Sequence, residues 1–294
     1  MSRFQVAGVG TLMKGRRLLA SWLPADSAQC STRWRRFATR VECYLHRHAI
    51  PERTEWVKVQ QGLAQGLWIQ IDLARERTWW AGTHEPEVQK VLLQVLSATT
   101  VFYDVGAHIG FFSLPAARLG ARVIAFEPDP ENAARLRVHI DRNHLEHKIE
   151  VIEVALWSDS VPSIIFRRGI PGSQGGIANG SLRPAIATGP LIGVRATKLD
   201  DFALGGAPMP QVIKMDVEGA ASEVLSGATE TIRTSRPILI IEVHTSSEYD
   251  GVVQFLDHLC YAANWDIPPE GFPRECYAFP PLPSLNRILH QISS

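Results

Sequence analysis

The chain has 294 residues, of which 45% are hydrophobic, so it can bury a full core as one large domain or as a domain with an accessory piece. Thirty basic residues balance thirty acidic ones, and this balance gives no overall indication of a nucleic-acid partner. The four cysteines show neither a C-x-x-C pair nor a zinc-binding spacing, so we expect reduced thiols in a cytoplasmic protein.

Residues 1–80 are predicted to form a basic accessory segment. Residues 1–60 hold eleven basic against four acidic residues, a net charge of +7. Apolar residues at helical spacing over 27–48 predict an amphipathic helix, either docked on the main domain or, as the less favoured alternative, in contact with an anionic membrane. Alternation over 57–73 predicts a hairpin. No apolar run approaches the roughly 20 residues of a membrane span, and the basic residues follow the apolar N-terminal stretch, which is the reverse of the order in a signal peptide.

A domain at 81–282 is predicted to alternate helices and strands, which is typical of a parallel sheet covered by helices. Pro86 begins the first helix, and Asp129 with Pro130 forms an N-cap and first turn for a later one. The core strands are predicted at 101–103, 122–127, 149–154, 212–216 and 237–244. Two hairpins are added at 164–166 with 191–194 and at 263–267 with 276–279, and residues 283–294 form a tail.

A glycine turn joins the first core strand to its helix. The strand ends on Asp104, the turn reads Gly106-Ala-His108-Ile-Gly110, and the next strand ends on Glu127. Because strand tips in such sheets border a ligand crevice, Glu127 is placed to accept both hydroxyls of a ribose. The G-x-G-x-x-G of dinucleotide enzymes is absent, which favours a nucleoside without a pyrophosphate, and S-adenosylmethionine is the common candidate. The alternative is that the glycines only make a tight turn.

Four more polar residues follow the last two parallel strands: Asp216, Glu218, Glu242 and His244. Buried charged groups are costly unless they are paired or functional, so we expect these side chains to border the same crevice. His244 suits a general base near neutral pH, although it could instead bond only to backbone. These oxygen and nitrogen ligands could also hold a divalent cation, but no compact ligand motif is present and we expect no metal.

Five ordered motifs give the chain a specific resemblance over about residues 82–280. They are Asp104-Val-Gly-Ala-His-Ile-Gly110, Phe126-Glu-Pro128, Leu199-Asp-Asp-Phe202, Lys214-Met-Asp-Val-Glu-Gly-Ala220 and Ile241-Glu-Val-His244. In this order they resemble the FkbM family of S-adenosylmethionine-dependent methyltransferases. The resemblance implies a doubly wound α/β fold with a seven-stranded, mostly parallel sheet in the order 3-2-1-4-5-7-6, strand 7 antiparallel, and helices on both faces.

The resemblance also assigns roles to individual residues. Asp104 and Gly106 would contact the methionine part of the donor, with His108 and Gly110 in the same turn; Glu127 would bind the ribose, and Ala155 and Leu156 would flank the adenine. Asp216 and Glu218 would lie near the methyl group and the acceptor. The family usually has a second glutamate where this chain has Ala221, which matters only if that glutamate holds the acceptor.

The predicted function is therefore O-methylation of a hydroxyl on a sugar, glycolipid or natural product, by in-line methyl transfer with help from a general base. The expected partner is a hydroxylated small molecule or glycan, with peripheral membrane contact through the basic N-terminus as a further possibility. Two alternatives stay open: a nicotinamide-dependent oxidoreductase, and a non-catalytic module that keeps the methyltransferase fold. The missing phosphate-binding glycines argue against the first, and only Ala221 supports the second.

Overall fold

The computed structural model describes residues 54–73, 75–169, 175–177, 189–266 and 271–281. The chain divides into two compact units, Met1–Pro51 and Glu52–Ser294, and every described residue belongs to the second. The predicted basic helix at 27–48, the tail at 283–294 and most of the glycine-rich loop at 169–180 lie outside the described residues, so these expectations stay predictions.

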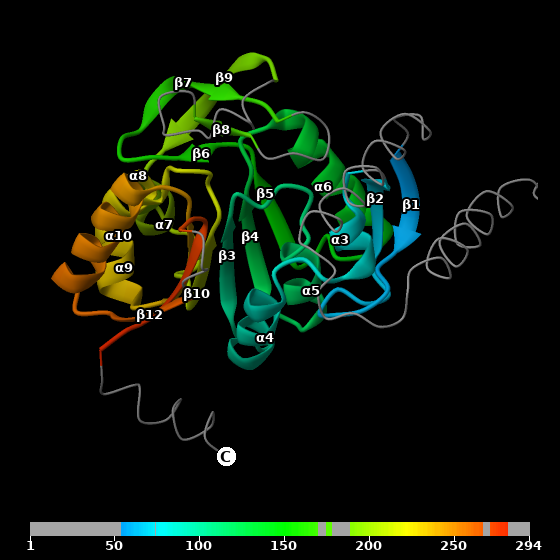
Figure 1. The fold of residues 1–294 in the computed structure, drawn as a ribbon, viewed down its shortest axis with the longest axis horizontal. Helices are drawn as coiled ribbons and strands as arrows, with labels where there is room; N and C mark the ends of the chain where they lie inside the picture. Colours follow the sequence, from blue (N-terminus) through cyan, green and yellow to red (C-terminus); the bar gives the residue numbers. More distant parts are fainter. Residues whose placement is uncertain (1–53, 74, 170–174, 178–188, 267–270, 282–294) are drawn as a thin grey trace, which may run out of the picture. The chain divides into compact units, whose positions relative to one another are not determined.

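A seven-stranded sheet forms the centre of the second unit (Figure 1). Its strands lie in the order β12-β13-β11-β10-β3-β4-β5; all neighbours from β11 to β5 are parallel, and β13 is antiparallel to both β11 and β12. When these seven strands are numbered in chain order and the sheet is read across from β5, the order is 3-2-1-4-5-7-6. The mostly parallel α/β sheet expected from the sequence is confirmed. Its strands are β3 (Val101–Val105), β4 (Arg122–Phe126), β5 (Ile149–Ile152), β10 (Val212–Met215), β11 (Ile238–Val243), β12 (Ala262–Asp266) and β13 (Arg274–Phe279).

Helices cover both faces of this sheet because the parallel strands are apolar on both faces. Phe102 and Tyr103 are neighbours on β3 and are both fully buried, yet they belong to two different hydrophobic clusters. The first cluster includes residues of α4 (Pro86–Val95), α5 (Ser113–Arg118) and α6 (Pro130–Arg142). The second includes residues of α7 (Leu199–Leu204), α8 (Ala221–Ser226), α9 (Thr229–Ser235) and α10 (Ser246–His258). Figure 1 shows α7 to α10 gathered on one side of the sheet.

A hairpin precedes the sheet and packs on it. Its strands β1 (Thr54–Lys58) and β2 (Trp68–Asp72) pair antiparallel, and the short helix α3 (Arg77–Ala81) follows. Ile69 and Ile71 are buried in the same cluster as α4 to α6. Asn143 at the end of α6 accepts a hydrogen bond from Trp68 N at 2.8 Å and donates one to Trp68 O at 2.7 Å. The hairpin is therefore part of the same compact unit as the sheet, whereas the sequence analysis grouped it with the segment that ends at residue 80.

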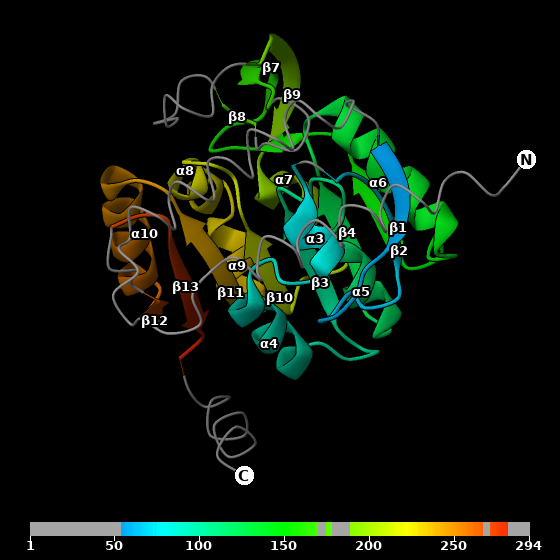
Figure 2. The same ribbon diagram turned by 45° about the vertical axis from the view of Figure 1, so that its right-hand side comes forward.

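A second, four-stranded sheet in the order β6-β9-β7-β8 lies over one end of the large sheet in both ribbon views (Figures 1 and 2). Its strands are β6 (Ala155–Leu156), β7 (Val161–Arg167), β8 (Gly176–Ile177) and β9 (Leu191–Thr197). The antiparallel pairing of β7 with β9 confirms the added hairpin, and that of β12 with β13 confirms the terminal one. Within the described residues, none of the helices has the length and apolar character needed to cross a membrane.

Candidate active site

A cavity lies at the carboxyl ends of the parallel strands. Its walls come from the loops that follow β3, β4 and β10, from β6 and β8, and from the segment before α4. Six of the residues predicted to bind the donor line it: Asp104, Gly106, His108, Glu127, Ala155 and Leu156. Asp216 and Glu218 also line it, whereas Gly110, Glu242 and His244 do not. The structure thus brings the donor residues and two of the four predicted catalytic residues to one cavity.

The glycine turn is closed tightly against two neighbouring strands. Gly106 has a φ of +79°, and a Cβ there would lie 1.9 Å from the carbonyl oxygen of Asp216. The amide groups of Gly106 and Ala107 both donate to the Phe126 carbonyl oxygen at 3.0 Å. Only glycine allows this approach, so the turn joins the ends of β3, β4 and β10 around the cavity.

Asp104 is a buried carboxylate near the carboxyl end of β3. One of its oxygens, Oδ2, accepts a hydrogen bond from Ser113 Oγ at 2.5 Å, while Oδ1 has no hydrogen-bond partner among the described residues. Burial raises the pKa of this carboxyl. A buried acceptor without a partner is costly, so this oxygen is available to a ligand that carries a donor.

Glu127 follows β4 and is only 4% exposed. Its two oxygens accept from the backbone amides of His108 and Asp129, each at 2.8 Å. Burial raises the pKa of Glu127 to about 7, against the effect of these hydrogen bonds. The helix that follows begins as predicted, with Pro130 in its first turn and with Asp129 capping it through a 2.9 Å hydrogen bond from Glu131 N. The cap and the two amides together fix where the Glu127 carboxylate lies.

His108 lies in the glycine turn with a φ of +50° and contributes a ring as well as its backbone. Its ring centroid is 4.8 Å from that of Trp79 on α3. Burial, reinforced by nearby positive charges such as Arg135, lowers the pKa of His108 to about 3. The His108 side chain is therefore uncharged at physiological pH and lines the cavity.

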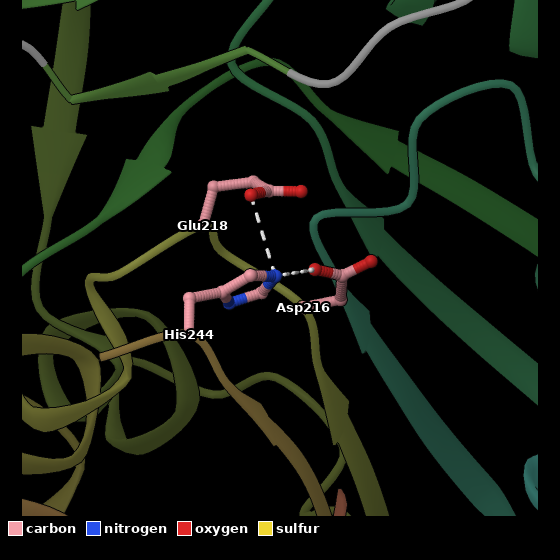
Figure 3. Close-up of side chains that lie close together, drawn as sticks. All are labelled: Asp216, Glu218 and His244. Atoms are coloured by element: carbon pink, nitrogen blue, oxygen red, sulfur yellow. Dashed lines mark ion pairs between the residues drawn. The ribbon is translucent and has the colours of Figure 1, made fainter. Parts of the chain in front are cut away.

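Asp216, Glu218 and His244 meet at the ends of β10 and β11 (Figure 3). The imidazole Nε2 of His244 lies 3.3 Å from Glu218 Oε2 and 3.8 Å from Asp216 Oδ1. Glu242 Oε1 is 3.5 Å from the same nitrogen. We call these four side chains the carboxylate–histidine cluster. Asp216 and Glu218 line the cavity, whereas His244 and Glu242 do not.

The charges in this cluster are not balanced. Burial, with Asp216 and Glu85 as neighbouring negative charges, raises the pKa of Glu242 to about 10. A raised pKa favours the protonated form of this carboxyl, which does not suit a general base at neutral pH. The catalytic role that the sequence analysis gave Glu242 stays a prediction.

The sequence analysis gave no site role to Lys214 and Glu85. Lys214 is buried on β10, and its Nζ lies 3.8 Å from Asp216 Oδ2 and 3.9 Å from Glu85 Oε2. Burial alone would raise the pKa of Glu85, but the Lys214 ammonium and a hydrogen bond with His84 outweigh it and lower the pKa to about 2. Both residues line the cavity. A lysine inside an apolar strand run was the signal that could have identified this ion pair.

Two groups of described residues could hold a metal ion: Asp216 with Glu218 and His244, and Asp216 with Glu85 and Glu242. In each group every residue offers one ligand atom, and the three atoms lie within 4.8 Å of one another. Oxygen and imidazole ligands of this kind are used by several divalent cations. The expectation of no metal stays a prediction, for which removal of metal by a chelator is the test.

Residues 104–264, more than half of the chain, match the family model of the methyltransferase FkbM domain. Hexuronic acid methyltransferase AglP of Haloferax volcanii is 28% identical over 183 residues, which cover 58% of this chain and 67% of that relative. The 2-O-methyltransferase NoeI of Sinorhizobium fredii is 31% identical over 224 residues, which cover 66% of this chain and 86% of that relative.

Among solved structures, the chain is similar to methyltransferase FkbM from Methylobacillus flagellatus KT, with 21% identity and a TM-score of 0.46. The match covers 63% of this chain and 44% of that one, so less than half of that protein's length is spanned. The family model and the 31% identity to NoeI, 86% of which is covered, show the family of this chain.

Proposed function

Because the chain belongs to the FkbM methyltransferase family, we propose that it methylates a hydroxyl group of a sugar-containing acceptor, with S-adenosylmethionine as the methyl donor. The names of both relatives support a sugar or another hydroxylated acceptor: one is a hexuronic acid methyltransferase and the other a 2-O-methyltransferase. The observation that carries the proposal is Glu127, a buried carboxylate that faces the same cavity as the glycine turn.

The residues around the cavity fit the donor. Glu127 is held by two backbone amides at a strand end, where a carboxylate can accept the two hydroxyls of a ribose. The unpartnered Oδ1 of Asp104 suits the amino group of the methionine part. Ala155 and Leu156 on β6 supply an apolar wall for the adenine. The turn has no pyrophosphate-binding glycine pattern, which favours a nucleoside donor over a dinucleotide.

The residues near the methyl acceptor must align its hydroxyl group with the methyl group of the donor and take up the hydroxyl proton. The sulfonium of the donor supplies a methyl group that is already electrophilic, so alignment is the main requirement on the protein. Asp216 and Glu218 are the two members of the carboxylate–histidine cluster that line the cavity, and we propose that the acceptor hydroxyl binds to them. His244, whose Nε2 lies 3.3 Å from Glu218 Oε2, would support the carboxylate that takes up the proton.

The loss of the family's second glutamate does not weaken the proposal. Ala221 is fully buried as the first residue of α8 and does not line the cavity. The carboxylates that face the acceptor end, Asp216 and Glu218, are both present. A non-catalytic role, which only Ala221 supported, therefore has no observation in its favour.

The donor can be tested without knowing the acceptor. S-adenosylmethionine and its demethylated product are both expected to raise the melting temperature of the full chain, and NADH is expected to have no effect. A ligand that binds only the native state stabilises it by RT ln(1 + [L]/Kd), about 2.7 kcal/mol when its concentration is 100 times Kd. Differential scanning fluorimetry with the three ligands at matched concentrations gives the answer. Stabilisation by NADH and not by the methionine derivatives would overturn the methyltransferase assignment in favour of an oxidoreductase.

A further inference from the structure

Glu248 joins the two segments that carry the carboxylate–histidine cluster. Its Oε1 accepts a hydrogen bond from Ala221 N and its Oε2 one from His244 N, both at 2.7 Å. The residue is only 2% exposed. One buried carboxylate therefore connects the segment after β10, which holds Asp216 and Glu218, to the end of β11, which holds His244.

The local sequence around Glu248 favours a fixed position for its side chain. Thr245-Ser-Ser-Glu248 has the pattern of a capping box, and Thr245 Oγ1 accepts from Glu248 N at 3.2 Å. In a capping box the glutamate normally reaches back to the N–H of the capping residue. Here its two oxygens bind the amides of His244 and Ala221 instead. Both carboxylate oxygens of Glu248, in the first turn of α10, thus accept hydrogen bonds from residues outside that helix.

The segment after β10 needs such an attachment. Glu218 has a φ of +50° and Gly219 one of +95°, so a non-glycine residue of the cluster is held in the left-handed region. Conformations of this kind persist only where the surroundings determine them. At one end, the Asp216 carbonyl is packed against Gly106. At the other end, α8 has no side-chain cap from its own N-cap residue, and Glu248 binds its first amide.

We propose that Glu248 is a positioning residue, which sets the distance between His244 and the two carboxylates that face the acceptor. The inference rests on the proposed function, because the distance matters only if these groups act together on the acceptor. Glu248 touches neither the donor residues Asp104 and Glu127 nor the cavity itself. Its effect is therefore expected in turnover and not in donor binding.

Two variants each change a different property of the Glu248 side chain. Glu248→Asp keeps the charge but is one methylene shorter, so it cannot reach both amides; Glu248→Gln keeps the length but loses the charge and one acceptor. Both are expected to lower kcat by roughly 10-fold, less than the 10²-fold that a 1 Å misplacement can cause. Affinity for S-adenosylmethionine should not change. Asp250→Asn, at an exposed position on the same helix, is the matched control and should behave as wild type.

A spectroscopic measurement tests the same inference without an acceptor. In histidine-labelled protein, the ring resonances of His244 should shift in both Glu248 variants and stay in place in Asp250→Asn, at a temperature well below melting. Wild-type kcat together with unshifted His244 resonances in Glu248→Asp would overturn the positioning role, even if the variant melts earlier. Failure of the proposed function would look different: the unmodified chain would not bind S-adenosylmethionine, whatever the state of Glu248.

Discussion

Replacing Glu127 by alanine is expected to weaken the binding of S-adenosylmethionine by roughly 10- to 100-fold, because hydrogen bonds to a charged group contribute about 1.5–3 kcal/mol and 1.4 kcal/mol is a factor of ten. The carboxylate is already held by the amides of His108 and Asp129, so it needs no rearrangement to receive a ribose. Glu127→Gln should give a smaller loss of the same kind, since it keeps the volume and one acceptor but not the charge.

The affinity should also depend on pH through this residue. Without donor, burial raises the pKa of Glu127 to about 7, while two ribose hydroxyls need the ionised form as acceptor. Protonation therefore competes with the donor, and affinity should fall by up to about tenfold as the pH is lowered from 8 to 6, since only the ionised fraction is competent. The free protein should respond in the opposite sense. Between the ordinary value of 4.5 and about 7 the folded state binds more protons than the unfolded one, so this carboxyl favours folding below 4.5 and loses that contribution as the pH rises through 7.

Isothermal titration calorimetry at several pH values measures the affinity, and thermal unfolding of the free protein at the same pH values measures its stability. Glu150→Gln, at an exposed position on β5, is a suitable control because it changes a carboxylate of the same domain outside the cavity. The Glu127→Gln variant should bind more weakly and should lose the pH dependence. An unchanged dissociation constant in Glu127→Ala would contradict the ribose role, and loss of the folded state would indicate that the two amide contacts are mainly structural.

The positions of the residues that we expect to bind the donor could be predicted from the sequence because they are local to strand ends. Asp104, Gly106 and Glu127 are fixed by two short strand–turn segments, and the rule that parallel strands end at one edge brings them together without knowledge of side-chain contacts. The same rule placed Asp216 and Glu218 at this edge. In each case the periodicity of one segment and the chemistry of its last residue were sufficient.

The remaining interactions depend on contacts between distant segments, and no local pattern encodes those. The Glu85 carboxylate reaches Lys214 from the segment before α4, at a separation of more than 100 residues. Glu248 looks like an ordinary capping-box residue in the sequence, and its bonds to Ala221 and His244 follow only from the packing of α8 against α10. The position of a residue at a strand end also does not predict whether its side chain lines the cavity. His244 follows β11 as expected, but it contacts Glu218 and does not line the cavity.

Removing either carboxylate that faces the acceptor is expected to have the largest effect on turnover. Glu218→Gln and Asp216→Asn should each lower kcat by about 10²–10⁴-fold, the range in which a positioned proton-transfer group contributes. Both residues line the cavity next to the donor residues, so an amide there keeps the shape but cannot take up a proton. Affinity for S-adenosylmethionine should stay close to normal, because neither variant changes Glu127 or Asp104. Glu230→Gln, exposed on α9, is the control.

His244→Ala distinguishes two routes for the proton. If His244 itself receives it, kcat/KM should rise with pH, and the alanine variant should lose both the rise and most of the activity. If a carboxylate receives it and His244 only supports the carboxylate, the profile should be flat and the loss smaller. We expect the flat profile and the smaller loss, because His244 Nε2 lies 3.3 Å from Glu218 Oε2 and His244 does not line the cavity. Titration of Glu242 should not change the pH profile of kcat/KM near neutral pH, since its pKa is raised to about 10.

A chelator completes this experiment, because the same three side chains would hold a metal if one were used. Activity that survives chelation assigns the effects of Glu218→Gln and Asp216→Asn to proton transfer and alignment. Activity that is lost and then restored by a divalent ion would assign them to metal ligation, and His244→Ala should in that case lower the affinity for the ion. The two outcomes also differ in pH dependence: a metal ligand must be deprotonated before it binds, so metal affinity itself would rise with pH.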